Sequence, residues 1–362
     1  MFLARSGISV LAASLDDGDI SSYLFPVLAV LQDLLKDQRN AKKASQNVRA
    51  LTHIADPVGS GVPLDIAWLT GIIPLGFVPA QIAISPDETT LYVAHESGRE
   101  VSVVDIASAS VTGAIKRAGA GAITLSPDGK RLYTIGQKRC YVVDTRLREV
   151  IRILPAANVN RILCSADGRF ICLSFQNALG GLIRLIETEN YTVENEFDLG
   201  ALTNASLALG ISPLNDRFYA TMLVDRTAPT DVLAISKVDY LQHDITGFSD
   251  PRSMAFSSDG AWLYVGGIDE VYIVDAATNK TFYREKIGTQ GYPVKVIGVT
   301  PDDRYVYAIY TCNYDVYRID TVKGIATCIA YFPSVGGAVL NKTGTYIYSS
   351  HPDMSWISIY RL

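Results

Sequence analysis

Two of the four histidines of this 362-residue chain stand at matching places in its sequence. His95 and His351 each lie ten residues after the start of a recurring turn-like segment, and the carboxylates Glu96 and Asp353 are close by. Imidazole and carboxylate groups can hold a divalent metal or act as acid and base. These four residues form one candidate metal site, with His95 and His351 as its catalytic groups. The alternative is two partly exposed histidines bonded to loop groups.

Cationic residues form a second candidate site. Arg161, Arg252 and Lys295 stand near the starts of short apolar segments, where guanidinium and ammonium groups would face one channel and attract an anionic ligand. Gln81 and Asn204 place amides at similar points. We predict that these five residues bind the ligand. The alternative for the cations is a set of exposed charges at the rim, paired with neighbouring carboxylates.

Linear catalytic signatures are missing from the sequence. It contains no Gly-x-Ser-x-Gly, no P-loop and no His-Glu-x-x-His motif. The five cysteines are scattered without a Cys-x-x-Cys pair, which is typical of buried thiols that pack as small hydrophobic groups. The cofactor therefore stays open, and a divalent metal is the one that the histidine and carboxylate residues would suit.

A repeat of about 40 residues organises the chain from about residue 66 to its end. Four short strands are expected in each unit, and the first two are joined by a turn in which Pro, Asp, Asn and Gly favour tight reversal. Four strands per repeated unit predict the blade of a β-propeller. The turns recur at spacings of 39 to 47 residues, and they begin at Ser85, Ser126, Ser165, Ser212, Ser257, Thr300 and Asn341.

The second strand of each unit carries the strongest signature. Counted from the start of the turn, position six is a large apolar residue, and position seven is Tyr in six copies and Cys172 in the other. Because this Tyr recurs so regularly, we interpret it as packing between blades and not as a catalytic group. The Ser-Pro-Asp-Gly, Leu-Tyr-Val and Val-Val-Asp elements resemble the YVTN-type seven-bladed β-propeller repeat. The resemblance covers about residues 66 to 362. It implies an all-β fold that binding proteins, electron-transfer partners, lactonases and lyases share.

The two ends of the chain carry separate expectations. The seventh unit supplies three strands, so we expect residues of about 66–75 to add its outer strand and close the ring. Residues 1–64 show two apolar stripes at helical spacing and then a linker rich in Pro and Gly. They predict a helical hairpin that packs on the propeller, or alternatively an arm for oligomerisation or partner docking. The chain is thus divided into an arm, 1–64, and a propeller, 65–362.

Composition narrows the partners. Lys and Arg number 32 against 37 Asp and Glu, with a net charge of −5 and no dense basic run, which argues against nucleic acid as the partner. No apolar stretch is long enough to span a bilayer. The N-terminal segment is a poor signal peptide, so a soluble protein in the cytoplasm is slightly favoured.

Two functions from different classes agree with these residues. We favour a binding or scaffold propeller that engages a protein or small-molecule partner on the face formed by its variable loops, because no complete set of acid, base and electrophile is visible. The alternative is a propeller enzyme, a lactonase-like hydrolase or a lyase, with His95 and His351 in a metal- or His-dependent site at the top of the ring.

Overall fold

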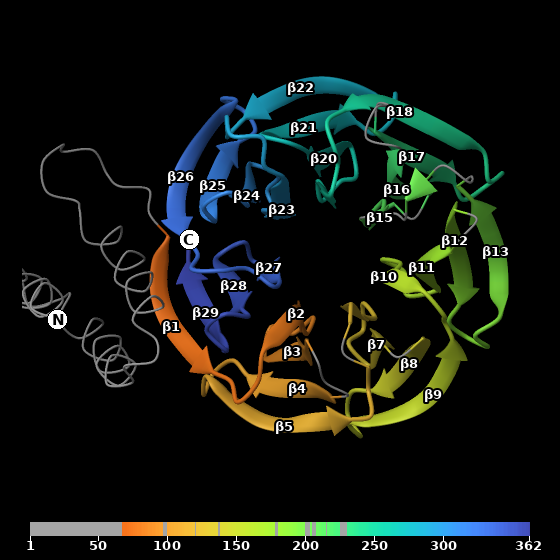
Figure 1. Cartoon of the computed structure of the whole chain (residues 1–362), viewed down its shortest axis with the longest axis vertical. Helices are drawn as coiled ribbons and strands as arrows, with labels where there is room; N and C mark the ends of the chain where they lie inside the picture. The colour runs from red at the N-terminus through yellow and green to blue at the C-terminus, as the bar shows by residue number, and fades with distance from the viewer. Residues whose placement is uncertain are drawn as a thin grey trace, which may run out of the picture.

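Seven sheets stand around a central axis as the blades of a β-propeller (Figure 1). The computed structural model describes residues 67–96, 100–119, 121–136, 138–177, 180–199, 203–204, 208–214, 216–224 and 230–362. In this part of the chain the predicted all-β, seven-bladed fold is confirmed. The helical hairpin predicted for residues 1–64 lies outside the described residues.

Blades 1 to 3 each contain four antiparallel strands, which follow one another from the axis to the rim in chain order. Blade 1 consists of β2 (Pro79–Ile84), β3 (Thr90–His95), β4 (Glu100–Asp105) and β5 (Ser110–Lys116). Blade 2 consists of β6 (Ile123–Leu125), β7 (Arg131–Gly136), β8 (Arg139–Asp144) and β9 (Glu149–Pro155). Blade 3 consists of β10 (Val159–Cys164), β11 (Phe170–Asn177), β12 (Gly180–Glu187) and β13 (Val193–Asp198).

Blades 4 to 6 continue the pattern, although blade 4 has a short extra strand that also pairs with its second strand. Blade 4 consists of β14 (Thr203–Asn204), β15 (Leu209–Ile211), β16 (Arg217–Val224), β17 (Thr230–Ser236) and β18 (Gln242–Phe248). Blade 5 consists of β19 (Ser253–Phe256), β20 (Trp262–Gly266), β21 (Glu270–Asp275) and β22 (Lys280–Lys286). Blade 6 consists of β23 (Val294–Val299), β24 (Tyr305–Tyr310), β25 (Asp315–Asp320) and β26 (Ile325–Tyr331).

Blade 7 combines strands from the two ends of the described chain. Its strands are β27 (Ala338–Leu340), β28 (Tyr346–His351), β29 (Trp356–Arg361) and, outermost, β1 (Trp68–Pro74). β1 pairs antiparallel with β29 along its whole length. On the turn side of the same seam, Glu88 of blade 1 accepts hydrogen bonds from Asn341 Nδ2 at 3.0 Å and from the Thr343 amide at 3.1 Å. Strand pairing and this carboxylate both join blade 7 to the start of the propeller.

The turn between the first and second strands of a blade is held by its own polar residues, which explains why its sequence recurs. In blade 1, Ser85 Oγ donates to Asp87 Oδ1 at 2.5 Å and accepts from the Thr90 amide at 2.9 Å. Blades 2, 3 and 5 repeat both hydrogen bonds with their own Ser and Asp. In these four blades the hydroxyl and the carboxylate therefore fix the reversal between the first and second strands.

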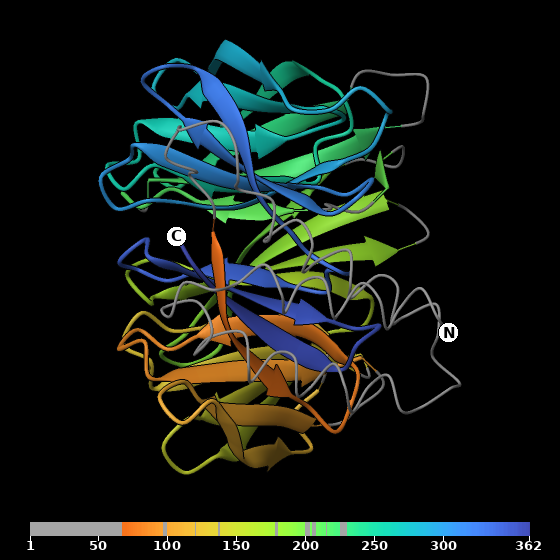
Figure 2. The same cartoon turned by 90° about the vertical axis from the view of Figure 1, so that its left-hand side faces the viewer.

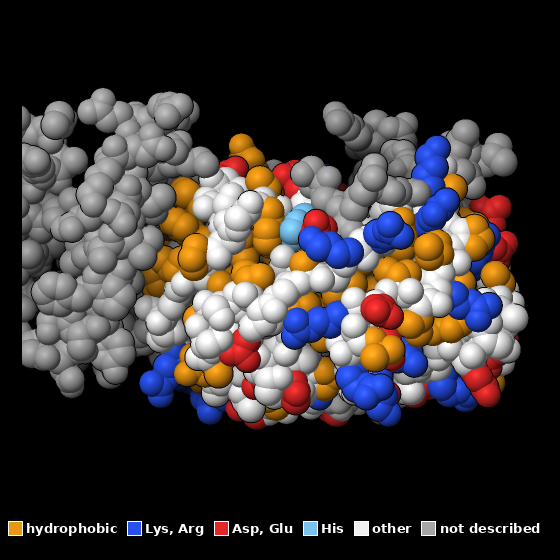
Figure 3. All heavy atoms as spheres, turned by 90° about the horizontal axis from the view of Figure 1, so that it is seen from below, with side chains coloured by type: hydrophobic (Ala, Val, Ile, Leu, Met, Phe, Trp, Pro, Cys, Tyr) orange, Lys and Arg blue, Asp and Glu red, His pale blue; other side chains and the backbone are white. Residues whose placement is uncertain are grey.

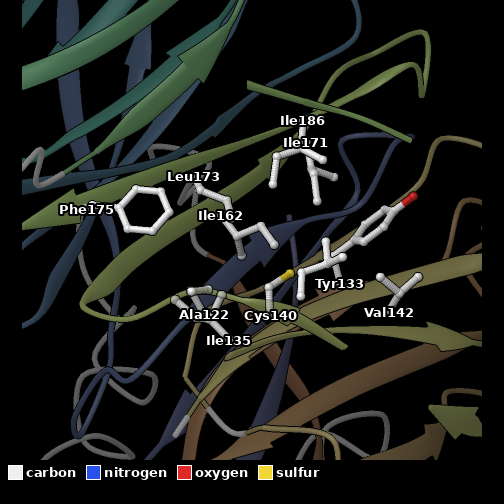
Figure 4. Close-up of a cluster of buried hydrophobic side chains, with 12 residues drawn as sticks. Ala122, Tyr133, Ile135, Cys140, Val142, Ile162, Ile171, Leu173, Phe175 and Ile186 are labelled. Atoms are coloured by element: carbon white, nitrogen blue, oxygen red, sulfur yellow. The ribbon is translucent and has the colours of Figure 1, made fainter. Parts of the chain in front are cut away.

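Adjacent blades pack through the sixth and seventh positions after each turn. Tyr133 of blade 2, for example, shares a buried cluster with Ile162 and Ile171 of blade 3 (Figure 4). Each seventh-position residue is buried and clusters with the sixth-position residue of the next blade, so the predicted packing role of the tyrosines is confirmed. Around the ring these pairs are Tyr92 and Leu132, Tyr133 and Ile171, Cys172 and Phe218, Tyr219 and Leu263, Tyr264 and Val306, Tyr307 and Ile347, and Tyr348 and Leu91.

The loops of the propeller lie on two opposite faces of the ring, as the side view shows (Figure 2). The recurring turns occupy one face together with the turns between third and fourth strands, because successive strands of a blade are antiparallel. The loops between second and third strands and the connections between blades occupy the other, which we call the variable-loop face. Within the described residues, no helix is long and apolar enough to cross a membrane.

Candidate ligand site in the central channel

A cavity of about 590 Å³ opens on the variable-loop face, between blades 1, 2 and 3. Gln81 and Glu96 line it from blade 1, Gly121 and Lys138 from blade 2, and Arg161 from blade 3. These residues stand at the starts of first strands, at the end of β3 and in the β7–β8 loop. The structure thus places two of the predicted ligand-binding residues, Gln81 and Arg161, in one cavity on the face predicted to bind the partner.

Small residues of blade 2 leave the cavity open. Gly121 and Ala122 precede β6, and the Gly121 amide donates to the Ile135 carbonyl at 2.7 Å. The backbones lie so close that a Cβ atom on residue 121 would stand 2.8 Å from this carbonyl oxygen. Glycine is therefore required at 121 for the local fold, and blade 2 places no large side chain from residues 121 and 122 between Gln81 and Arg161.

Arg161 and Lys295 stand at the same level of the central channel, one in blade 3 and the other in blade 6. Arg161 pairs with Ser174 and Lys295 with Ile309, and both partners lie nine residues after the start of their blade's turn. We call this the cationic level. The other blades contribute mostly small residues to it, namely Gln81, Ala122, Ala208, Ser253 and Gly337.

Lys295 is half-buried and its strand is held in place by the neighbouring blade. Ser253 Oγ accepts from the Val296 amide at 2.8 Å and donates to the Val294 carbonyl at 3.1 Å, so it fixes both residues that flank Lys295. Lys295 Nζ donates to the Gly336 carbonyl of the next blade at 3.2 Å. Within the described residues no carboxylate lies within ion-pair distance of this ammonium group.

Electrostatics tie the two cations together. Burial, and to a smaller extent the positive charge of Arg161, together lower the pKa of Lys295 to about 8. Burial also lowers the pKa of Arg161, but a guanidinium group stays charged at neutral pH. Arg161 Nη1 donates to the carbonyl of Asn160 at 3.0 Å, which keeps the head group at the wall of the cavity.

The innermost strands make the channel electropositive. Arg161 and Lys295 are the only charged residues within β2, β6, β10, β15, β19, β23 and β27, and neither is acidic. Charges of one sign in a narrow cleft focus their field on a ligand. The part of the outer rim seen in Figure 3 is different, because Lys and Arg side chains there are interspersed with acidic and apolar ones.

The structure separates the remaining predicted ligand-binding residues from this site. Arg252 is exposed just before β19, and its Nε and Nη2 atoms donate to Asp250 Oδ2 at 2.8 and 2.6 Å. It therefore forms the paired rim charge that was the alternative expectation. The backbone of Asn204 pairs with Leu223 in blade 4, and its side chain lies outside the described part.

The two histidines have different surroundings. His95 ends β3, stacks on Phe77 with ring centroids 3.3 Å apart, and places Nε2 2.9 Å from Ser102 Oγ. Burial lowers its pKa. His351 is fully buried, and its Nδ1 atom donates to the Ser334 carbonyl, since a carbonyl can only accept. The expectation of a partly exposed residue bonded to loop groups is wrong for His351, which belongs to the packed interior of blade 7.

The predicted metal site gains no support from this arrangement. Glu96 and Asp353 are exposed at their loops. Within the described residues, no three side chains among His, Cys, Asp and Glu are grouped in a way that would hold a metal ion. His351 Nε2 is buried without a hydrogen-bond partner among the described residues, and burial lowers the pKa of this imidazole to about 4. The neutral, enclosed ring is suited to packing.

Sequence reasoning missed two residues of the cavity. Lys138 lies in the β7–β8 loop and Asn158 in the connection from blade 2 to blade 3, and both line the cavity. Both have left-handed backbones, with φ of 64° and 62°. Asn favours this conformation, which is a sequence signal for a tight loop. No comparable signal exists for Lys138 except its place between second and third strands.

Comparison with known proteins identifies the architecture. No family model and no curated protein matches the chain, so membership of the YVTN-type family stays a prediction. Among solved structures, the chain is similar to one from Kuenenia stuttgartiensis hydrazine synthase, with 18% identity and a TM-score of 0.68. The alignment covers 84% of this chain and 99% of that chain. At this identity the similarity shows the fold alone, and that fold is the seven-bladed β-propeller.

Proposed function

We propose that the chain is a ligand-binding propeller that takes a small anionic molecule into the cavity of its variable-loop face. One observation carries the proposal: Arg161 lines the cavity, and the only other charge on the innermost strands, Lys295, is a second cation at the same level. The field of the channel therefore favours negative ligands. Glu96 and Lys138 also line the cavity, and their opposite charges cancel.

The dimensions of the cavity agree with a small molecule. Its volume of about 590 Å³ falls in the range of typical ligand pockets, which is about 300–1,000 Å³. The guanidinium of Arg161 can bind an oxyanion through two parallel hydrogen bonds. The amides of Gln81 and Asn160, which also line the cavity, can donate to or accept from the neutral part of the ligand.

An enzyme built on the two histidines has less support. His351 is enclosed in blade 7, and His95 is engaged by Phe77 and Ser102, so neither imidazole lines the cavity. A general base must reach the proton that it removes. The arrangement of the two histidines therefore favours the binding function over the hydrolase or lyase alternative.

Equilibrium dialysis tests the proposed function with a panel of small anions, citrate, inorganic phosphate and acetate, and with glucose as a neutral compound. We expect the full chain to retain at least one anion and no glucose. Arg161→Glu should abolish retention, because it reverses the charge of the cavity wall. Arg146→Glu, in the exposed β8–β9 turn of the opposite face, is the matched control and should bind as the unmodified chain. Equal retention by both variants would contradict the proposal.

A further inference from the structure

We propose that the ligand presents a dianionic phosphate group, which lies near the channel axis between Arg161 and Lys295. This inference rests on the proposed function and names the ligand class. Either a phosphate ester or free phosphate can supply the group, and the experiment below distinguishes these two sources.

The geometry of the ring brings both cations to one group. Arg161 and Lys295 occupy equivalent positions of their blades, so they stand at one height in the channel. Blades 3 and 6 are three steps apart in a ring of seven, and Figure 1 shows β10 and β23 on opposite sides of the axis. The side chains of Arg161 and Lys295 are long and start at one height on opposite walls. They can therefore contact a single small group from both sides.

The other positions of the cationic level leave room for this group. Ala122, Ala208 and Gly337 contribute a methyl group or no side chain, and the hydroxyl of Ser253 is engaged by the backbone of β23. Gln81 is the one further long side chain, and its amide can donate to an oxyanion. The cationic level is therefore lined mainly by small side chains, and its two cations and one amide are the groups able to bind an anion.

Charge selects a dianion over a monoanion. The guanidinium and the ammonium repel each other, which contributes to the lowered pKa of Lys295. A carboxylate supplies one negative charge, whereas a phosphate group carries close to two at neutral pH and so complements a guanidinium and an ammonium together. Its oxygens can accept the parallel donors of Arg161 and a remaining N–H of Lys295, since Gly336 takes only one of three.

The cavity accounts for the rest of a phosphate ester. Arg161 belongs both to the cationic level and to the wall of the 590 Å³ cavity, so a phosphate held at Arg161 is continuous with this space. Residues with apolar surface, Ala80, Ile135 and Val159, line the same cavity and suit an organic group. An ester should therefore bind more tightly than inorganic phosphate.

Isothermal titration of the full chain at pH 7.5 tests the inference with inorganic phosphate, phenyl phosphate and acetate as probes. We expect both phosphates to bind, phenyl phosphate more tightly, and acetate at least about tenfold more weakly than phosphate. Arg161→Gln and Lys295→Gln should each weaken phosphate binding about tenfold or more, because each removes a charge-assisted hydrogen bond. Arg146→Gln, which removes the same charge on the opposite face, should leave binding unchanged.

A pH series separates direct contact by Lys295 from a general effect of charge. Arg161 is the one charged group whose effect on the Lys295 ammonium is resolved, and its own charge does not change between pH 7.5 and 9.5. Phosphate binding should therefore weaken as the pH rises past about 8, because the free ammonium of Lys295 loses its proton. Lys295→Arg stays charged and should bind phosphate with little dependence on pH over this range.

The outcomes distinguish this inference from the proposed function. Binding of acetate or citrate that depends on Arg161 but not on Lys295, with no preference for phosphate, would overturn the phosphate inference and leave the anion-binding function intact. Identical binding of every probe to the unmodified chain, Arg161→Gln and Arg146→Gln would overturn both. Equal affinity for inorganic and phenyl phosphate would identify free phosphate as the ligand and contradict the ester.

Discussion

Arg161 on β10 and Lys295 on β23 stand at one level of the central channel on opposite walls, and the positive charge of the first lowers the pKa of the second. Two like charges that lie close together in partly buried surroundings raise the free energy of the folded state. The arrangement is therefore best explained as a feature of binding and not of stability.

This explanation predicts that the chain becomes more stable when the lysine charge is removed. The pKa of Lys295 in the folded state, about 8, is below its value of about 10.4 in an unfolded chain. The charged form is thus disfavoured by folding at neutral pH. In phosphate-free buffer at pH 7, Lys295→Met should raise the melting temperature by about 2–4 °C, as measured by calorimetry. Lys280→Met, at an exposed position of β22, should not.

The pH dependence of that difference gives the contradicting outcome. As the pH rises from about 8 toward about 10, the folded wild-type lysine loses its charge, so the gap between the chain and Lys295→Met should narrow. A gap that is constant across this range would show that the methionine acts through apolar packing alone.

His351 predicts a loss of stability in mild acid. Burial places the pKa of its folded form at about 4, below the unfolded value of about 6.5. The neutral ring therefore contributes stability above about pH 6.5, and this contribution is lost as the pH falls toward 4. The melting temperature should fall between pH 7 and 5, and His351→Gln should fall less over the same range.

His95 supplies the matched control for this effect. It is only partly buried, so His95→Gln should keep most of the acid sensitivity of the unmodified chain. If a folded His351→Gln variant loses stability between pH 7 and 5 as steeply as the wild type, another group is responsible.

The exception in the blade-packing pattern predicts a compensating pair. Cys172 replaces the usual Tyr in blade 3, and its partner Phe218 is the only aromatic residue at the sixth position of any blade. Cys172→Tyr should overpack this interface and destabilise the chain by about 1–3 kcal/mol, measured by chemical denaturation. Adding Phe218→Leu should recover part of the loss, which would appear as a coupling energy in a double-mutant cycle. Additive effects would refute compensation.

The seam between the ends of the propeller predicts a dependence on β1. Ile73 is fully buried and lies in β1, the strand that pairs with β29. Ile73→Ala should lower the free energy of unfolding by about 2–5 kcal/mol, whereas Val111→Ala, at a position of β5 that is 43% exposed, should lower it far less.

Deleting residues 66–75 should lower the melting temperature far more than deleting an exposed loop. An unchanged transition would refute the role of this strand in closure.

Much of the fold could be predicted because the residues that hold each blade together recur at the same positions of the repeat. The Ser and Asp of the turn form a hydrogen bond, as Ser85 and Asp87 show. The Tyr of the second strand packs against the sixth-position residue of the next blade, as Tyr92 shows. The packing between blades recurs seven times and the bond between turn hydroxyl and Asp recurs in blades 1, 2, 3, 5 and 6, so a period in the sequence is enough to reveal them.

The site was harder to predict because it depends on positions that do not repeat. Arg161 and Lys295 were recognised as channel cations, but Lys295 lies one residue farther from its turn than Arg161 does, and their equal height follows from a bulge in β23, between Val296 and Gly298, that shifts the register by a residue. His95 and His351 share a repeat position, yet one is packed against Phe77 at an open edge and the other is enclosed beside Ser334. Equivalent positions in the sequence therefore do not imply equivalent exposure.

A diffraction measurement with tungstate tests the central claim most directly, because this tetrahedral dianion resembles phosphate and scatters anomalously. Crystals of the full chain soaked in tungstate should show an anomalous peak on the channel axis, in contact with the Arg161 guanidinium and the Lys295 ammonium. The peak should disappear in Arg161→Gln crystals and persist in Arg146→Gln crystals. A channel without a peak, in crystals whose tungstate binds elsewhere on the surface, would contradict the account.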